Sequence, residues 1–196
     1  MFASIVIVTI LNGNITLNIQ EVYVLVLHRQ ITACLPRPAH KYEGAYPLGF
    51  ERYIPKMLQT TNYIHLFSGL AKTGHRVDCK PEVKPDTIAD CLDLPFPDNY
   101  FDGGMADPMY ETKFAKNLYN MPMPKWSDWT REFVRVVKKY GLIGVMGNYE
   151  INRLVGCQYW EVHYFANRPK HYPRVVTIFV KTEDVPKIHL SERVTE

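Results

Sequence analysis

The sequence has 196 residues, of which 46% are hydrophobic and 22% charged, a composition typical of an ordinary globular protein. A chain of this length fits one domain more easily than two. The formal net charge of +3 permits a nucleic-acid partner without requiring one. Four widely spaced cysteines, Cys34, Cys79, Cys91 and Cys157, form no CxxC pair, which argues against a zinc site and against a dense disulfide framework.

The cysteine pattern favours a reducing, intracellular setting, and we expect a cytoplasmic protein. The apolar start, residues 1–13, has no basic segment and reaches Asn12-Gly13 before it attains a membrane-spanning length. We therefore expect a soluble chain that does not associate with membranes.

The first 35 residues predict a β-hairpin extension. Two β-rich runs, residues 4–11 and 15–19, flank an Asn-Gly-Asn turn, and a further apolar run follows at residues 22–27. Because the hairpin has almost no ionisable side chains, we expect it to pack against the main domain, a second copy of the chain or a partner protein. The predicted division is a hairpin extension (1–35), an α/β domain (36–183) and a polar tail (184–196).

The middle of the chain predicts an α/β domain with a Rossmann-like, mostly parallel sheet. Residues 36–47 have the composition of a loop, suited to a lid, and residues 50–58 predict a short helix. Apolar spacing predicts a longer helix over residues 126–139. Strands are expected at residues 63–67, 76–78, 87–89, 103–106 and 142–146, with an antiparallel finish at 159–165 and 175–180.

Three features at strand ends suit a nucleoside-containing cofactor, since open α/β sheets bind ligands at the carboxyl ends of their strands. A glycine loop lets a ligand approach the backbone, one carboxylate can accept from ribose hydroxyls, and a second can accept from an adenine amino group. Each feature alone also has an ordinary explanation as a turn, a strand end or a cap. The candidate cofactor-binding residues are Phe67, Ser68, Gly69, Asp78, Asp90, Cys91 and Leu92.

A fourth feature, Asp107-Pro108-Met109-Tyr110, follows the predicted strand at residues 103–106. The Asp107 side chain and the Pro108 carbonyl can both accept from an amino group, and Tyr110 offers an aromatic face to a planar base. Asp107, Pro108 and Tyr110 are therefore the candidate catalytic residues. Seven scattered histidines show no metal-ligand spacing, and we expect no metal.

In this order the motifs resemble those of class I S-adenosylmethionine-dependent methyltransferases. The stretch DCLDLPFPDNYFDGGMADPMY resembles the acidic, LPF, FD and DPPY succession of that family, and RVVKKYGLIGVM resembles its RVLKPGG segment. The resemblance covers residues 63–149. It implies that Gly69 borders the methionine part of S-adenosylmethionine, Asp78 holds the ribose, Asp90 reaches the adenine, and residues 107–110 hold a target amino group.

The resemblance implies a methyltransferase that acts on an amino group, with adenine N6 in DNA or RNA as the favoured acceptor. Basic residues near residues 168–174 could contact phosphates. Met109 stands where the family has a second proline, and only the eight residues 68–75 separate Phe67 from Arg76. Two alternatives therefore stay open: an inactive binding or inhibitor module, and an enzyme that cleaves S-adenosylmethionine.

Overall fold

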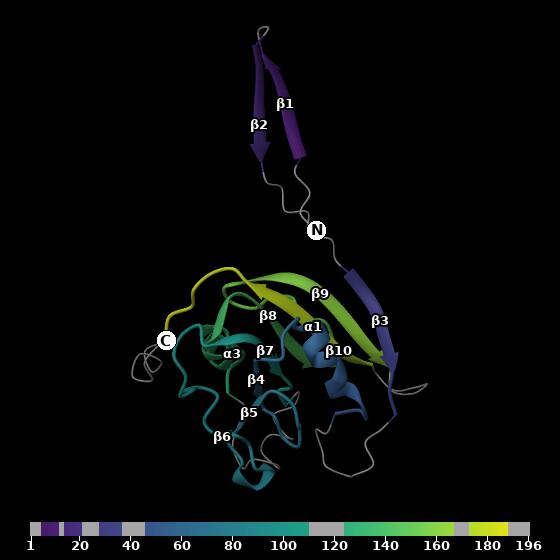
Figure 1. The fold of residues 1–196 in the computed structure, drawn as a ribbon, viewed down its shortest axis with the longest axis vertical. Coiled ribbons are helices and arrows are strands. Elements are labelled where there is room, and N and C mark those ends of the chain that lie inside the picture. Colours follow the sequence, from purple (N-terminus) through teal and green to yellow (C-terminus); the bar gives the residue numbers. More distant parts are fainter. Residues whose placement is uncertain are drawn as a thin grey trace.

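The computed structural model describes residues 5–11, 14–20, 28–36, 46–109, 124–166 and 173–187. The first two strands, β1 (Ile5–Leu11) and β2 (Asn14–Gln20), form a separate two-stranded sheet (Figure 1). They pair antiparallel, with Leu11 opposite Asn14 next to the turn and Ile5 opposite Gln20 at the far end. The predicted hairpin is confirmed, while the apolar run at residues 22–27 lies outside the described residues.

The main sheet has eight strands in the order β3-β9-β10-β8-β7-β4-β5-β6. In chain order they are β3 (His28–Cys34), β4 (Tyr63–Leu66), β5 (His75–Asp78), β6 (Thr87–Ile88), β7 (Phe101–Ala106), β8 (Val137–Gly147), β9 (Cys157–Ala166) and β10 (Arg174–Lys181). The described helices are η1 (Phe50–Tyr53), α1 (Ile54–Met57), η2 (Pro81–Val83) and α3 (Trp126–Val136). Strand β3 was not predicted, and it adds an outer strand parallel to β9.

Strand directions give the sheet its Rossmann-like character. Strands β4 to β8 are parallel to one another, whereas β10 runs antiparallel to both β8 and β9. The chain builds outward from β4 to β6 and then returns to place β7 and β8 on the other side of β4. This order has a switch point between β4 and β7, the position at which doubly wound sheets bind ligands. The predicted fold class is confirmed.

Helices cover both faces of the sheet, because alternate strand residues point to opposite sides. On one face α3 packs against Ile64, Leu66, Ile143 and Val145. On the other face η1 and α1 pack against a second set, which is Tyr63, Met105, Leu142, Met146 and Ile178. The helix expected at residues 50–58 is therefore present, with a 3-10 first turn, and the result is a three-layer arrangement around two apolar cores.

The helix expected over residues 126–139 is shorter than predicted. It ends at Val136, because Val137 has extended backbone (φ −90°, ψ 140°) and pairs with Phe101 as the first residue of β8. Helical spacing at Val136 and Val137 was misleading, since both are β-branched and equally suited to a strand. In the part of the chain described here, no helix is both long and apolar enough to cross a bilayer.

Candidate functional site

The carboxyl ends of β4, β5, β6, β7 and β8 lie along one edge of the sheet, since these strands are parallel. The predicted site residues that the structure describes lie at these ends or shortly after them. Residues 67–69 follow β4, Asp78 ends β5, Asp90 comes after β6, and Asp107 comes directly after β7. The fold thus brings the predicted residues to the edge that such sheets use for ligands.

The connection between β4 and β5 is short and has no helix. Residues 67–74 join these parallel neighbours, whereas a parallel crossover usually needs a dozen residues or more. In this connection, both Phe67 (φ 54°) and Gly69 (φ 48°) adopt a left-handed backbone conformation. The loop is held by the Ser68 amide, which donates to the Val77 carbonyl (3.2 Å), and by the His65 ring, whose Nδ1 lies 2.9 Å from the Thr73 carbonyl oxygen.

Asp78 binds the glycine loop directly. Its Oδ2 accepts from the Gly69 amide (2.9 Å) and its Oδ1 accepts from the Lys80 amide (3.0 Å). The residue is buried, and burial raises the pKa of its carboxyl, while the amide donors of Gly69 and Lys80 oppose that rise. Two residues of the predicted cofactor set are thus in contact, and in this arrangement the Asp78 carboxylate holds the loop.

Beside Gly69, the Ser68 hydroxyl has a distinctive environment. Ser68 is 3% exposed, and within the described residues its Oγ has no hydrogen-bond partner. A buried hydroxyl without a partner costs free energy, so such an atom in a strand-end loop suggests that a ligand group can satisfy it.

Asp90 stands at the outer end of the same edge. It is exposed, its Oδ1 accepts from the Leu92 amide (2.9 Å), and its carbonyl accepts from the Asp93 amide (3.1 Å). Cys91 is buried against the α3 side of the core, and burial raises the pKa of its thiol, with a further contribution from Asp90. The Asp90 side chain therefore shapes a turn that places Cys91 in the core and leaves its own carboxylate at the surface.

Asp107 lies at the switch point. Its amide donates to the Leu66 carbonyl across β7 and β4 (3.4 Å), and its Oδ1 lies 3.8 Å from Nη1 of Arg174. The side chain of Asp107 is 8% exposed, so a nearly buried carboxylate faces a guanidinium supplied by β10. Pro108 is buried and Met109 half-buried, while Tyr110 lies outside the described residues.

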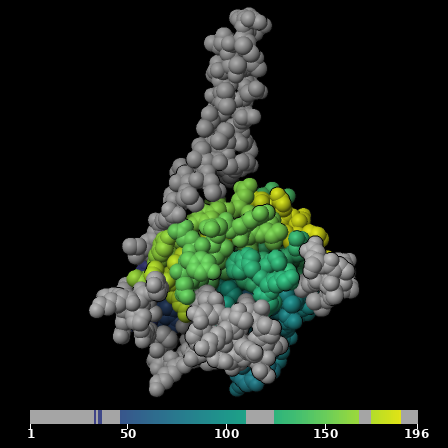
Figure 2. All heavy atoms as spheres, turned by 180° about the vertical axis from the view of Figure 1, so that it is seen from behind, coloured from purple at the N-terminus to yellow at the C-terminus, as the bar shows by residue number. Residues whose placement is uncertain are grey.

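A cavity of about 400 Å³ opens at the carboxyl ends of β7 and β8. Its size falls within the usual range for small-molecule sites. The wall is formed by the segment after β7, the start of α3 and the segment after β8, and its residues are Pro108, Met109, Pro124, Trp126, Trp129, Met146, Gly147, Tyr149, Glu150, Ile151, Asn152 and Arg153. In the view of Figure 2, the green segments between residues 124 and 166 lie next to one another on the main body.

Sequence reasoning found Pro108 and Met109 but missed the rest of this wall. The rule that strand ends carry ligands applies equally to β8, and it would have drawn attention to residues 147–153. Phe67 connects the two parts of the edge, because its ring packs edge-on against Trp129, with centroids 5.1 Å apart. In the described part of the chain, no group of His, Cys, Asp or Glu is arranged to hold a metal.

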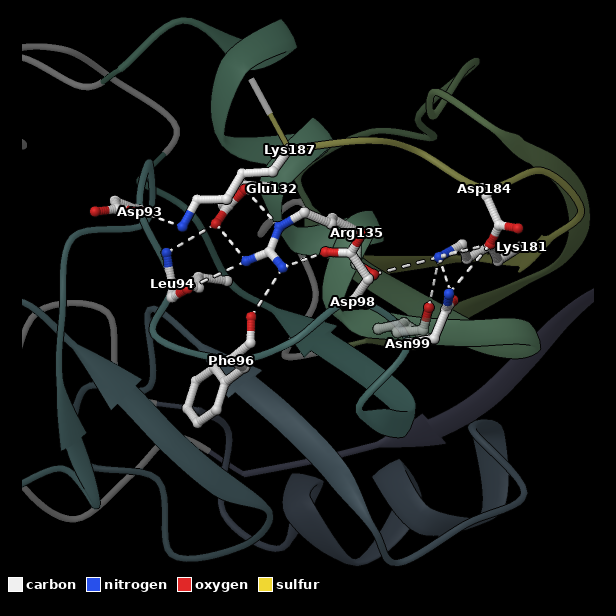
Figure 3. A network of polar contacts seen from close by, with 11 residues as sticks. Asp93, Leu94, Phe96, Asp98, Asn99, Glu132, Arg135, Lys181, Asp184 and Lys187 are labelled. Atoms are coloured by element: carbon white, nitrogen blue, oxygen red, sulfur yellow. Dashed lines mark hydrogen bonds and ion pairs between the residues drawn. The ribbon is translucent and has the colours of Figure 1, made fainter. Parts of the chain in front are cut away.

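A buried ion network supports the segment that follows Asp90 (Figure 3). Arg135 on α3 donates to Glu132 Oε1 (2.7 Å) and Oε2 (2.9 Å), and to the carbonyl oxygens of Leu94 (3.1 Å) and Phe96 (2.8 Å). Glu132 in turn accepts from the Leu94 amide (2.9 Å). The network fixes residues 94–96 to α3 and thereby holds one end of the segment that carries Asp90.

No protein-family model and no curated protein matches the sequence. Solved structures do match the fold. The N-methyltransferase NodS from Bradyrhizobium japonicum WM9 has a TM-score of 0.47 at 10% identity, with 68% of this chain and 94% of NodS covered. The [4+2]-cyclase SpnF has a TM-score of 0.48 at 11% identity, with 67% and 80% covered.

A SAM-dependent methyltransferase from Aquifex aeolicus matches with a TM-score of 0.45 at 10% identity, covering 67% of this chain and 89% of that protein. The matched structures thus include S-adenosylmethionine-dependent methyltransferases and a cyclase. Similarity at this level concerns the fold alone, so cofactor and reaction have to be argued from the site's own residues.

Proposed function

We propose that this protein is an S-adenosylmethionine-dependent methyltransferase that acts on an amino group. The observation that carries the proposal is the continuous edge from Gly69 and Asp78 at the ends of β4 and β5 to Asp107 and its neighbouring cavity at the ends of β7 and β8. A methyl donor bound on one side of the switch point and an amino group bound on the other side would meet beside Asp107.

The residues around the β4–β5 loop fit the nucleoside cofactor. The partnerless Ser68 hydroxyl and the left-handed Gly69 backbone line its proposed position, and the exposed Asp90 carboxylate can accept from an amino group. Phe67, Cys91 and Leu92 would supply apolar contacts, and Asp78 would approach the ribose while holding the loop. When bound, S-adenosylmethionine supplies an electrophilic methyl group on sulfur.

On the acceptor side, Asp107 and Pro108 would orient the amino nitrogen. The Asp107 carboxylate, which faces the Arg174 guanidinium, can accept from an N–H of the acceptor. In the overall reaction an N–CH3 bond forms, the S–CH3 bond breaks, and the nitrogen releases one proton. Orientation and fixed charge would supply most of the rate.

The acceptor that the motif resemblance favours is adenine N6 in DNA or RNA, with Tyr110 providing an aromatic face to the base. The same proposal includes three further points. The hairpin extension ends at residue 35 and the polar tail begins after residue 183, the hairpin contacts a partner chain, and the protein is cytoplasmic. None of them is needed for the methyl-transfer chemistry itself.

A non-catalytic binding module is a second candidate, and one observation favours it. Both oxygens of the buried Asp78 carboxylate accept from backbone amides, so the residue has a complete structural role without a ligand. An enzyme that cleaves S-adenosylmethionine is a third candidate. Product analysis separates all three, because only a methyltransferase yields S-adenosylhomocysteine together with a methylated acceptor.

The test of the catalytic assignment compares two aspartates of the same segment of chain. Asp107→Ala removes the carboxylate at the carboxyl end of β7, whereas Asp102→Ala removes an exposed carboxylate near its amino end. We expect Asp107→Ala to lower methyl transfer by about 100-fold or more with little change in cofactor affinity, and Asp102→Ala to retain activity. Full activity in the Asp107→Ala variant would overturn the assignment.

A further inference from the structure

The wall of the cavity contains an acidic residue that is held in place by β9, which β10 separates from β8 in the sheet. Glu150 follows β8, and its carboxylate accepts from two phenols of β9: Tyr164 donates to Oε1, and Tyr159 donates to Oε2 at 3.4 Å. Two donors on different oxygens restrict rotation of the carboxylate. Among the described lining residues, Glu150 is the only one with negative charge.

Aromatic side chains make up much of the remaining wall. Trp126 and Trp129 meet edge-to-face, with centroids 4.9 Å apart and planes at 81°, so their rings stand nearly at right angles. Trp129 is buried, whereas Trp126 is 41% and Tyr149 is 74% exposed. The exposed rings at the rim can therefore stack on a flat ligand, and their faces carry partial negative charge.

The charges of the described residues that line the cavity favour a positive ligand. Arg153 is the one cationic side chain among the described lining residues, and it is exposed, so solvent screens it. The nearby Asp107 and Arg174 side chains neutralise each other as an ion pair. A carboxylate together with the faces of Trp and Tyr is the combination that binds organic cations in proteins.

We propose that this cavity binds a planar organic cation, of the amidine or protonated aminoheterocycle class, with Glu150 as its specificity-determining residue. The proposal rests on the proposed function for the fate of the ligand, which would be the methyl acceptor in place of adenine in DNA or RNA. Glu150 pairs with the positive N–H edge of the ring, while Trp126 and Tyr149 cover its face. A ligand bound in this orientation would direct a ring nitrogen toward Asp107.

The experiment compares benzamidine with benzamide, which has nearly the same shape but no charge. Binding to the full chain is followed by the quenching of tryptophan fluorescence or by calorimetry, without S-adenosylmethionine. We expect benzamidine to bind at least about tenfold more tightly than benzamide. Glu150→Gln should reduce this ratio to near one while benzamide affinity stays the same, because the amide keeps the shape and loses the charge.

Glu161→Gln is the matched control, since Glu161 lies on β9, pairs with His163 (2.8 Å) and does not line the cavity. It should keep the preference for benzamidine. Trp126→Ala should weaken benzamidine binding independently of Glu150. Equal affinity for both compounds, binding of neither, or a preference that survives Glu150→Gln would each overturn the proposal.

The comparison in wild-type protein needs no variant, so the proposal stays testable if Glu150→Gln folds poorly. Cofactor binding is measured separately. A protein that binds benzamidine through Glu150 but binds neither S-adenosylmethionine nor S-adenosylhomocysteine would retain this inference and would contradict the proposed methyltransferase function.

Discussion

Arg135→Met should be among the most destabilising single substitutions in the described part of the chain. The Arg135 side chain is 2% exposed and that of Glu132 is 1% exposed, so their 2.7 Å ion pair is buried. Removal of the arginine leaves the Glu132 carboxylate buried without its cation. Such a change typically costs about 3–5 kcal/mol, a large part of the stability of a domain.

The carboxylate left behind should account for much of this loss. Adding Glu132→Gln removes the uncompensated charge and keeps an oxygen that can accept from the Leu94 amide. The double variant Arg135→Met/Glu132→Gln should therefore be more stable than Arg135→Met alone, by roughly 1–3 kcal/mol. The free energy of unfolding is obtained from urea titrations followed by circular dichroism, with linear extrapolation to water.

Lys138→Met is the matched control, because it breaks an ion pair of similar length, 2.6 Å to Asp102, whose two side chains are 51% and 41% exposed. Its unfolding midpoint should stay close to that of the wild type. The reasoning would be refuted if Arg135→Met cost less than about 1 kcal/mol, or if the double variant were no more stable than the single one.

Gly74→Ala should destabilise the protein more than Gly49→Ala. Both glycines have positive φ (76° at Gly74 and 79° at Gly49), a conformation that costs an alanine about 1–2 kcal/mol. The two sites differ in the space for a side chain. A Cβ at Gly74 would lie 2.8 Å from Cδ2 of Tyr63, whereas the nearest atom to a Cβ at Gly49 would be 3.7 Å away. Overpacking adds about 1–3 kcal/mol at Gly74, so equal unfolding midpoints would contradict the packing described for the β4–β5 loop. Asp86 should contribute to stability in a pH-dependent way, because hydrogen bonds from Arg76 lower its pKa from 3.8 to about 2. A lowered pKa stabilises the fold above pH 3.8, and the contribution is lost as the pH falls through about 2. The side chain is 40% exposed, so screening reduces the effect to about 1 kcal/mol or less. Asp86→Asn should thus be less stable than wild type at pH 6 and nearly equal to it at pH 2, and a stability difference that grew toward acid would argue against the pair.

The strands near the centre of the sheet were predictable because their signals are local. Short apolar runs that end at glycine or aspartate gave the positions of β4, β5, β6 and β7, and their order gave the parallel arrangement. The same local pattern located Gly69, Asp78, Asp90 and Asp107, since each lies at the end of a strand or within three residues after it.

Features that depend on distant pairing were not predictable. Strand β3 has the mixed sequence HRQITAC and is stabilised by parallel pairing with β9, which lies more than a hundred residues further along the chain. The ion pair of Asp107 with Arg174 and the phenols that hold Glu150 join segments that only the folded sheet brings together. Neither the residue types nor their spacing in the sequence predicts such contacts.

For the loop after β4, some features were predictable from the sequence and others were not. Its shortness was visible in the sequence, as was the glycine that it contains. The use of Asp78 to hold that loop was not, because a carboxylate at a strand end can bind a ligand or a backbone amide equally well.

Calorimetric titration with S-adenosylmethionine and S-adenosylhomocysteine tests the central proposal most directly. The account predicts micromolar binding of both compounds by the wild type, a clear loss of affinity in Asp90→Ala, and no binding in Asp78→Ala, with folding of each variant checked by its unfolding midpoint. Absence of binding to either compound in the wild type would contradict the account and favour the non-catalytic binding module.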